Sequence, residues 1–196
     1  MKRIHYNNII NAVWYQALWF TAILGQTTYE WALVLLLGLH LVLVPNWQQE
    51  LKVMLACGLV GITADSTLTH FGVYVFTPDP ALMGVPLPIP FWLMTIWIGF
   101  AGTLLHSFSF FMTRPLVGTL IVAAVAPFSY AAAGRLGAVS FGPEAPVAMM
   151  IIGAAWLLVM PLLGRISAIW RSDDDDAGQG PHPETGHDTG PVYYPR

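Results

Sequence analysis

The sequence has 196 residues, of which 56% are hydrophobic and 10% charged, and its formal net charge is -3. Soluble domains carry about 25% charged residues, so this composition excludes an ordinary water-facing domain and favours a protein whose surface faces lipid. The single cysteine, Cys57, excludes an intramolecular disulfide and a cysteine-based zinc site, and no basic stripe is long enough to favour nucleic-acid binding.

Six apolar segments follow one another along the chain. They cover residues 8–24, 31–44, 51–75, 90–112, 115–133 and 146–169. A membrane-spanning helix needs about 20 residues, and segments three to six meet this requirement. The first two are short, and they are alternatively a tight helical hairpin with Glu30 at its turn. The pattern predicts an all-α fold, a polytopic transmembrane helical bundle with six spans.

The basic residues predict how this bundle lies in the membrane. If all six segments span, Arg135 lies alone on one side. The other side receives Lys2, Arg3, Lys52, Arg114, Arg165, Arg171 and Arg196. Because cytoplasmic loops are enriched in Lys and Arg, both termini are predicted to be cytoplasmic, in a multi-pass protein of the bacterial inner (cytoplasmic) membrane.

The predicted integral membrane domain covers residues 1–171, and residues 172–196 form a predicted disordered, acidic cytoplasmic tail. The tail histidines, His182 and His187, have no distinctive ligand spacing, so a solvated tail is preferred over a metal site. Between the third and fourth segments, residues 76–89 are rich in proline. They predict a stiff loop at the outer membrane surface, or alternatively a lid over an outward-facing cavity.

Asp65 is the most informative residue, because an acid within an apolar span costs roughly 2.5–3.5 kcal/mol on insertion scales. Gly58 and Gly61 share its helix face, which predicts that Asp65 faces neighbouring helices. Comparable small or polar faces run along the fourth, fifth and first segments. The candidate ligand-binding or proton-responsive residues are Asp65, Ser66, His106, Tyr130, Gln16 and Asn11.

The sequence leaves two roles open for these residues. A function is favoured for Asp65, with a structural hydrogen bond between helices as the alternative, and a structural role is favoured for His106. Asp65 lies about 13 residues, and His106 about 6, from the cytoplasmic ends of their antiparallel segments, a depth difference of about 10 Å. A direct pair therefore needs helix tilt or a bridging water, and Gln16 and Tyr130 are nearer in depth to Asp65.

Familiar catalytic motifs are missing from the sequence. It contains no Gly-rich phosphate loop, HExxH or GxSxG, and no helix with His at i and i+4. His40 and His70 are interpreted as interfacial or helix-packing residues. We therefore assign no catalytic, cofactor-binding or metal-binding residue.

Four stretches carry a further signal: NAVWYQALWFTAILG (11–25), GLVGITADSTLTHFGV (58–73), PFWLMTIWIGFAGTLLHSF (90–108) and PFSYAAAGRLGAV (127–139). In content and order they resemble a bacterial inner-membrane family, domain of unknown function 2878, over residues 5 to about 170. The resemblance implies a similar run of hydrophobic helices and no established activity. Genes of the family often lie near genes for fatty-acid-modifying enzymes. This resemblance implies a link to membrane-lipid or envelope-stress physiology.

The leading hypothesis is a non-enzymatic membrane protein, accessory to membrane-lipid or envelope homeostasis, that binds a small or lipidic ligand in its polar interior. One alternative is a small proton-coupled transporter or permease using Asp65, although no internal repeat is obvious. A weaker alternative is a membrane-embedded lipid-modifying enzyme that needs Asp65 and His106 within about 3 Å or joined by one water. Membrane lipid is the expected partner, and a homo-oligomer is left open.

Overall fold

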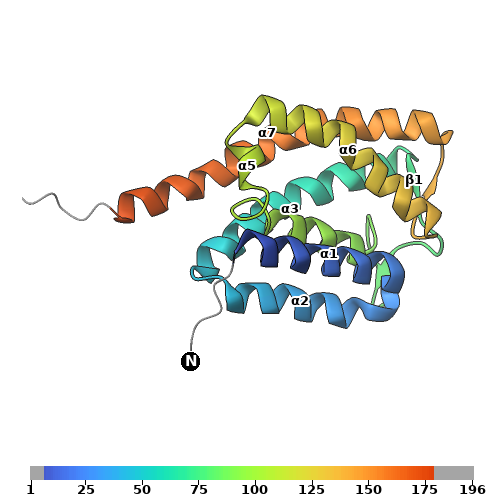
Figure 1. Cartoon of the computed structure of the whole chain (residues 1–196). Helices are drawn as coiled ribbons and strands as arrows, with labels where there is room; N and C mark the ends of the chain where they lie inside the picture. Colours follow the sequence, from blue (N-terminus) through green and yellow to red (C-terminus); the bar gives the residue numbers. More distant parts are fainter. Residues whose placement is uncertain (1–6, 179–196) are drawn as a thin grey trace, which may run out of the picture.

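The computed structural model describes the backbone of residues 7–178 and the side chains of residues 7–170. Its long helices lie side by side and alternate in direction along a common axis (Figure 1). In chain order the helices are α1 (Asn8–Gly25), the 3-10 helix η1 (Gln26–Tyr29), α2 (Glu30–Leu43), α3 (Trp47–His70), α4 (Phe91–Ala101), α5 (Ser109–Met112), α6 (Pro115–Arg135) and α7 (Ala145–Gly178). The chain is thus mostly helical, as predicted.

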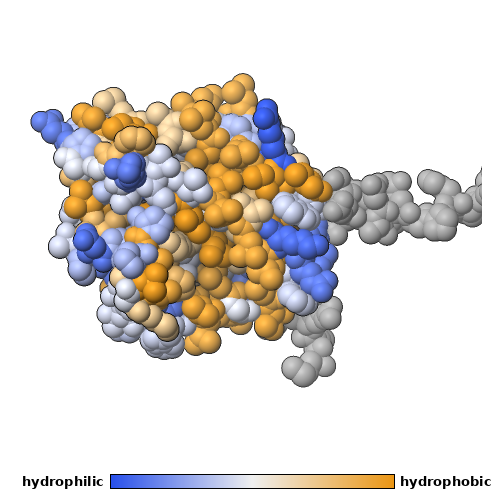
Figure 2. All heavy atoms as spheres, turned by 180° about the vertical axis from the view of Figure 1, so that it is seen from behind, coloured by the Kyte–Doolittle hydropathy of each residue, from blue (hydrophilic) through white to orange (hydrophobic). Residues whose placement is uncertain are grey.

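Within the described residues, four helical runs are long and apolar enough to cross a membrane. They are Asn8–Leu43, Trp47–His70, Pro115–Arg135 and Ala145–Trp170. The helix α4 has only 11 residues and is shorter than these runs. Figure 2 shows a face on which hydrophobic residues form a broad middle zone and hydrophilic residues gather toward two opposite ends. Length, composition and this surface pattern identify a membrane protein.

The first of these runs is a helical hairpin rather than one straight helix. The chain leaves α1 at Gln26, whose φ of 43° and ψ of -127° do not continue a helix. Helix α2 then returns beside α1 (Figure 1), and the indole N–H of Trp14 donates to the carbonyl of Leu36 over 2.8 Å. The first two predicted segments therefore form the hairpin that their short lengths indicated, and Glu30 begins its second helix.

The fourth predicted segment, residues 90–112, is not one helix, and this expectation was wrong. Helix α4 ends at Ala101, and a series of turns leads to the short α5. The side chain of Asn11 on α1 holds this stretch, because its amide donates to the Gly102 carbonyl and its oxygen accepts from the Ser107 N–H, over 2.9 and 3.2 Å. The hydroxyl of Thr103 also bonds the Phe100 carbonyl over 2.6 Å. Side chains that occupy backbone groups in this way compete with helical hydrogen bonds.

Four two-residue strands modify the predicted all-α fold at one end of the bundle. The third predicted segment ends early, because α3 stops at His70 and Tyr74–Val75 forms β1, which pairs antiparallel with β4 (Ser140–Phe141). In the proline-rich loop, β2 (Ala81–Leu82) and β3 (Val85–Pro86) form a small hairpin. The β1–β4 pair links the loop after α3 to the loop after α6.

The last helix runs past the boundary predicted between membrane domain and tail. Helix α7 continues to Gly178, seven residues into the segment assigned to the tail. After Gly164 the sequence contains no Gly or Pro before Gly178, so no helix-breaking residue interrupts this stretch. The rest of the predicted tail, including His182 and His187, lies outside the described residues.

The short helix α4 is a central element of the core. It contacts α1, α2 and α3, and most of its side chains are buried. Its Trp97 ring stacks on that of Trp156 from α7, with centroids 5.0 Å apart. Because the long helices pack around α4, its polar atoms, Gly99 and the C-cap Gly102 lie where neighbouring helices meet. The candidate sites are built around this helix.

Candidate functional site

Asp65 is the centre of a buried polar group between three helices. It lies on α3 and is 1% exposed. The indole N–H of Trp97 on α4 donates to Oδ2 over 2.6 Å, and the hydroxyl of Tyr130 on α6 lies 3.1 Å from both carboxyl oxygens. A buried carboxyl group needs such donors, since an unpaired one would be costly. The structure thus brings Asp65 and Tyr130 together and adds Trp97.

The absence of a side chain at Gly61 makes this arrangement possible. Gly61 precedes Asp65 by one helical turn, and a Cβ at Gly61 would overlap the indole ring of Trp97. At Gly58, one turn earlier, a Cβ would come within 3.1 Å of Ile98. The small-residue face predicted for α3 is therefore the face against which α4 packs, and it lets the Trp97 ring reach Asp65.

Tyr74 joins this group from outside the helices. The pairing of β1 with β4 holds it, and its ring stacks on that of Tyr130 with centroids 5.3 Å and planes 2° apart. Tyr74 is 2% exposed, and its hydroxyl makes no hydrogen bond of good geometry to any described residue. Burial, and then the negative charge of Asp65, raise the pKa of Tyr74, which keeps it a neutral hydroxyl. The Tyr74 hydroxyl thus lies close to Asp65 and Tyr130 without a well-formed hydrogen bond to either, and a ligand or water beside it would supply one.

A cavity of about 60 Å³ lies against this group and is lined by Tyr74, Trp97 and Tyr130. Its other aromatic lining residues are Tyr15, Trp19, Phe76, Trp92, Phe100 and Trp156. One water occupies about 30 Å³ in the liquid. The cavity therefore holds a small polar group or a few waters, not a whole lipid.

The cavity adjoins a larger groove of about 360 Å³ that runs between α1 and α6. The two share the lining residues Tyr15, Trp19, Phe100, Ser129 and Trp156. Ile121 and Val125 of α6 line the groove and are 43% and 59% exposed, so the groove opens at the apolar surface of the bundle. Aromatic and aliphatic side chains thus line two adjoining spaces, one open at this surface and the other next to Tyr74 and Tyr130.

Two other predicted site residues lie apart from the Asp65 carboxyl group. Gln16 is exposed and lines the groove. Ser66 follows Asp65 in the chain, but its hydroxyl donates to the carbonyl of Ile62 on its own helix over 2.6 Å. Neither side chain is bonded to Asp65 in the described structure.

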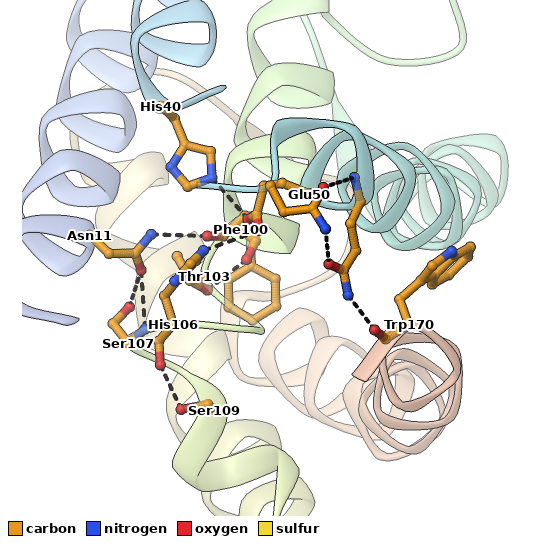
Figure 3. A network of polar contacts seen from close by, with 12 residues as sticks. Asn11, His40, Glu50, Phe100, Thr103, His106, Ser107, Ser109 and Trp170 are labelled. Carbon is orange, nitrogen blue, oxygen red and sulfur yellow. Dashed lines mark hydrogen bonds and ion pairs between the residues drawn. The ribbon is translucent and has the colours of Figure 1, made fainter. Parts of the chain in front are cut away.

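A second carboxylate, Glu50, forms a separate cluster near the start of α3. Its Oε1 lies 2.9 Å from Nε2 of His40 at the end of α2, and its Oε2 lies 3.1 Å from Nε2 of His106 in the turns after α4. Figure 3 shows the two imidazoles pointing toward this carboxylate from different elements. Fifteen residues separate Glu50 from Asp65 on α3, which is about 22 Å along the helix axis. His106 is therefore bonded to Glu50, and Asp65 and His106 belong to different sites.

Asn11 positions the chain that carries His106. It is fully buried, and besides its bonds to Gly102 and the Ser107 N–H it accepts from the Ser107 hydroxyl over 2.5 Å (Figure 3). This candidate residue thus belongs to the Glu50 end of the bundle. It fixes the turns between α4 and α5 rather than contributing to the Asp65 group.

A family model described as "Protein of unknown function (DUF2878)" matches residues 8–162. The chain belongs to this family. Neither the curated proteins nor the solved structures contain a match to it.

The DUF2878 match extends from the start of α1 into α7 and contains both carboxylate sites. It therefore confirms the family resemblance carried by the four sequence stretches. Because the family's function is unknown, a role for this DUF2878 protein must be argued from the two sites.

Sequence reasoning missed Glu50, which lies one residue before the predicted segment 51–75. A signal was present, since His40 and Glu50 lie ten residues apart on either side of the Pro45–Asn46 break, which allows adjacent helix ends to meet. His106 reaches Glu50 because it lies in the turns that follow α4. Hydropathy alone does not predict these turns.

Proposed function

We propose that this protein binds an amphipathic, lipidic ligand within the membrane and is a non-enzymatic accessory to membrane-lipid or envelope homeostasis. The polar end of the ligand would occupy the cavity at Asp65, Tyr74 and Tyr130, and its apolar chain the groove between α1 and α6. The observation that carries this proposal is an apolar groove that adjoins a buried polar group whose Tyr74 hydroxyl makes no hydrogen bond of good geometry.

The dimensions of the two spaces favour a ligand with unequal ends. The groove, at about 360 Å³, is within the range of about 300–1,000 Å³ that is usual for small-molecule sites. The inner cavity, at about 60 Å³, accommodates only a small hydroxyl, carboxyl or amide group. The indole N–H of Trp97 and the hydroxyl proton of Tyr130 are both donated to Asp65. The Tyr130 oxygen lone pairs and the Tyr74 hydroxyl therefore remain for a ligand, and because both phenols are neutral at physiological pH, the site suits a hydrogen-bonding group better than a strongly charged one.

For the orientation, we propose six crossings with both termini in the cytoplasm of a bacterial inner membrane. In this arrangement the α1–α2 hairpin supplies two crossings, and α4 with the turns to α5 supplies one that is partly non-helical. Lys52, Arg114 and Arg165 belong to chain segments near one end of the bundle, whereas Arg135 ends α6 at the other. Non-helical backbone is tolerated at membrane depth where protein covers it, and Asn11 supplies hydrogen bonds there.

Native mass spectrometry of the full chain released from a mild detergent tests the ligand proposal. We expect one lipidic species bound per chain and enriched over bulk membrane lipid. Ala126→Phe, which fills the groove from α6, should abolish this species. Thr67→Val on the exposed side of α3 is the matched control and should retain it.

Two results would count against lipid binding. One is a wild-type protein that carries no lipid or only a sample of the bulk mixture. The other is an Ala126→Phe protein that folds and binds the same species in the same amount.

The buried carboxyl group beside a cavity also supports a second candidate, a small proton-coupled transporter. In that case Asp65→Asn should abolish pH-dependent flux in proteoliposomes while membrane insertion is kept. A bound lipid without flux favours the first candidate, and flux without a bound lipid favours the second. The lipid-modifying enzyme is not proposed, because Asp65 and His106 lie in different sites.

A further inference from the structure

The Glu50 cluster has the donor set and the geometry of a metal site. Among the described residues, it is the one group in which three His, Cys, Asp or Glu side chains offer ligand atoms within 4.8 Å of one another. Two imidazole nitrogens and one carboxylate oxygen form a set that zinc commonly uses. We infer that His40, Glu50 and His106 bind one divalent transition-metal ion, for which zinc is the best-fitting candidate.

The distances between the ligand atoms fit this inference. Zinc bonds to imidazole nitrogen and carboxylate oxygen are about 2.0–2.2 Å, so neighbouring ligand atoms in a tetrahedral site lie about 3.3 Å apart. The two nitrogen–oxygen distances in the cluster are 2.9 and 3.1 Å. They involve the two different oxygens of Glu50, and one ligand atom from each of the three residues lies within 4.8 Å of the others. Small side-chain rotations would therefore bring the three atoms to the spacing of a tetrahedral site.

The ligands are held in position by their surroundings. The Trp14 ring stacks on His40 with centroids 4.2 Å apart, and Gly102 provides room for it, since a Cβ there would lie 3.0 Å from the His40 Nε2. Glu50 is in the first turn of α3, and Asn11 fixes the turns that carry His106. Ligands oriented by neighbouring groups bind metal more tightly than mobile ones.

Exposure indicates how an ion reaches the site. The side chains of His40 and Glu50 are 0% and 4% exposed, whereas that of His106 is 21% exposed. Access is therefore from the His106 side. With three protein ligands, a fourth coordination position remains for water or another small ligand, as in open rather than closed zinc sites.

The competing explanation is a metal-free cluster held by hydrogen bonds. Because both Nε2 atoms face a carboxylate oxygen, that form needs an Nε2–H on each histidine. The metal-bound form instead uses the Nε2 lone pair of each ring. The two explanations differ in metal binding, which can be measured without knowledge of any activity or of the ligand at Asp65.

The test is a titration of the full chain with Zn²⁺ and Co²⁺, purified through a tag that contains no histidine. We expect one Zn²⁺ per chain by elemental analysis and the visible absorption of four-coordinate Co²⁺. Affinity should fall at least tenfold in His106→Asn and in Glu50→Gln. His106 is partly exposed, so its variant tests the inference even if Glu50→Gln fails to fold.

Two control variants identify the ligands. His70→Asn changes an exposed histidine on α3, and a double variant, His182→Asn with His187→Asn, removes the C-terminal histidines. Both should keep the metal. The inference is overturned if the folded wild type binds neither ion, or if binding persists in His106→Asn and is lost in the C-terminal double variant.

Discussion

Helix α3 carries two buried carboxyl groups whose surroundings differ in kind. Asp65 receives hydrogen bonds from an indole and a phenol, which do not change charge near neutral pH, and it lies beside a cavity. Glu50 faces two imidazoles, which are common metal ligands. The chain thus surrounds one carboxyl group with groups suited to hydrogen-bonding a ligand and the other with groups suited to an ion.

The comparison also shows how two sites on one helix remain separate. About 22 Å of helix lies between them. Each site also depends on a different packing or hydrogen-bond contact. At Asp65 this is the missing side chain of Gly61, and at Glu50 it is the hydrogen bonding of Asn11 to the turns after α4. Substitutions at these two positions should damage one site and leave the other in place.

The largest effect is expected from Gly61→Ala. The new methyl group would overlap the Trp97 ring, so the ring must move away from Asp65 and leave the carboxyl group short of a donor. Overpacking alone costs about 1–3 kcal/mol, and the lost hydrogen bond adds to this. Thermal unfolding in detergent measures the change.

The matched control is Gly164→Ala on α7, where a Cβ meets nothing within 4 Å. It should be neutral, or stabilise the protein by up to about 1 kcal/mol through helix propensity. Equal unfolding temperatures for the two variants would refute the packing of Trp97 against Gly61.

Asn11→Ala should have the next largest effect. It removes the partner of the Gly102 carbonyl and of the Ser107 N–H and hydroxyl. The buried Gly102 carbonyl left unsatisfied costs about 1–3 kcal/mol, whereas the groups of the half-buried Ser107 can be solvated. Hydrogen exchange should become faster in residues 102–108, while the backbone around Asp65 keeps its protection. Equal acceleration at both places would show that the two sites are not independent.

The smallest effect distinguishes two tyrosines that stack on each other. Tyr130→Phe removes a donor from buried Asp65 and should destabilise the protein by about 1–3 kcal/mol. Tyr74→Phe removes a hydroxyl without a good partner, so stability should be unchanged or slightly higher, while retention of the bound lipid decreases. If both variants were equally destabilised, Tyr74 would have a hydrogen-bond role like that of Tyr130.

Much of the Asp65 site was predictable because it depends on local periodicity. The three- and four-residue spacing of Gly58, Gly61 and Asp65 indicated a closely packed helix face. Depth matching indicated Tyr130, and it also indicated Gln16, which is exposed and lies apart from Asp65. Trp97 was not identified as a donor, because the spacing of α4 placed it among bulky residues distributed around the helix. Only the contact between Gly61 and its ring shows why the indole N–H reaches Asp65.

The place of His106 in the Glu50 site and the end of α4 were not predictable, because both depend on contacts between residues distant in sequence. Asn11 and Ser107 are 96 residues apart, and Glu50 and His106 are 56 apart. Hydropathy predicted one continuous apolar segment over residues 90–112. It also placed Glu50 just outside the predicted segment 51–75. No local sequence pattern predicts that the Asn11 side chain forms hydrogen bonds with the backbone of Gly102 and Ser107 in the fourth segment.

The central claim, that a lipid chain lies between α1 and α6, is tested most directly by photocrosslinking with a photoactivatable phospholipid in native membranes. We predict labelling of peptides that line the groove around Phe108, Phe111 and Val122, and its loss in Ala126→Phe. Labelling that is just as strong at the exposed Leu35 and Leu39 of α2, and that does not change in Ala126→Phe, would contradict the claim.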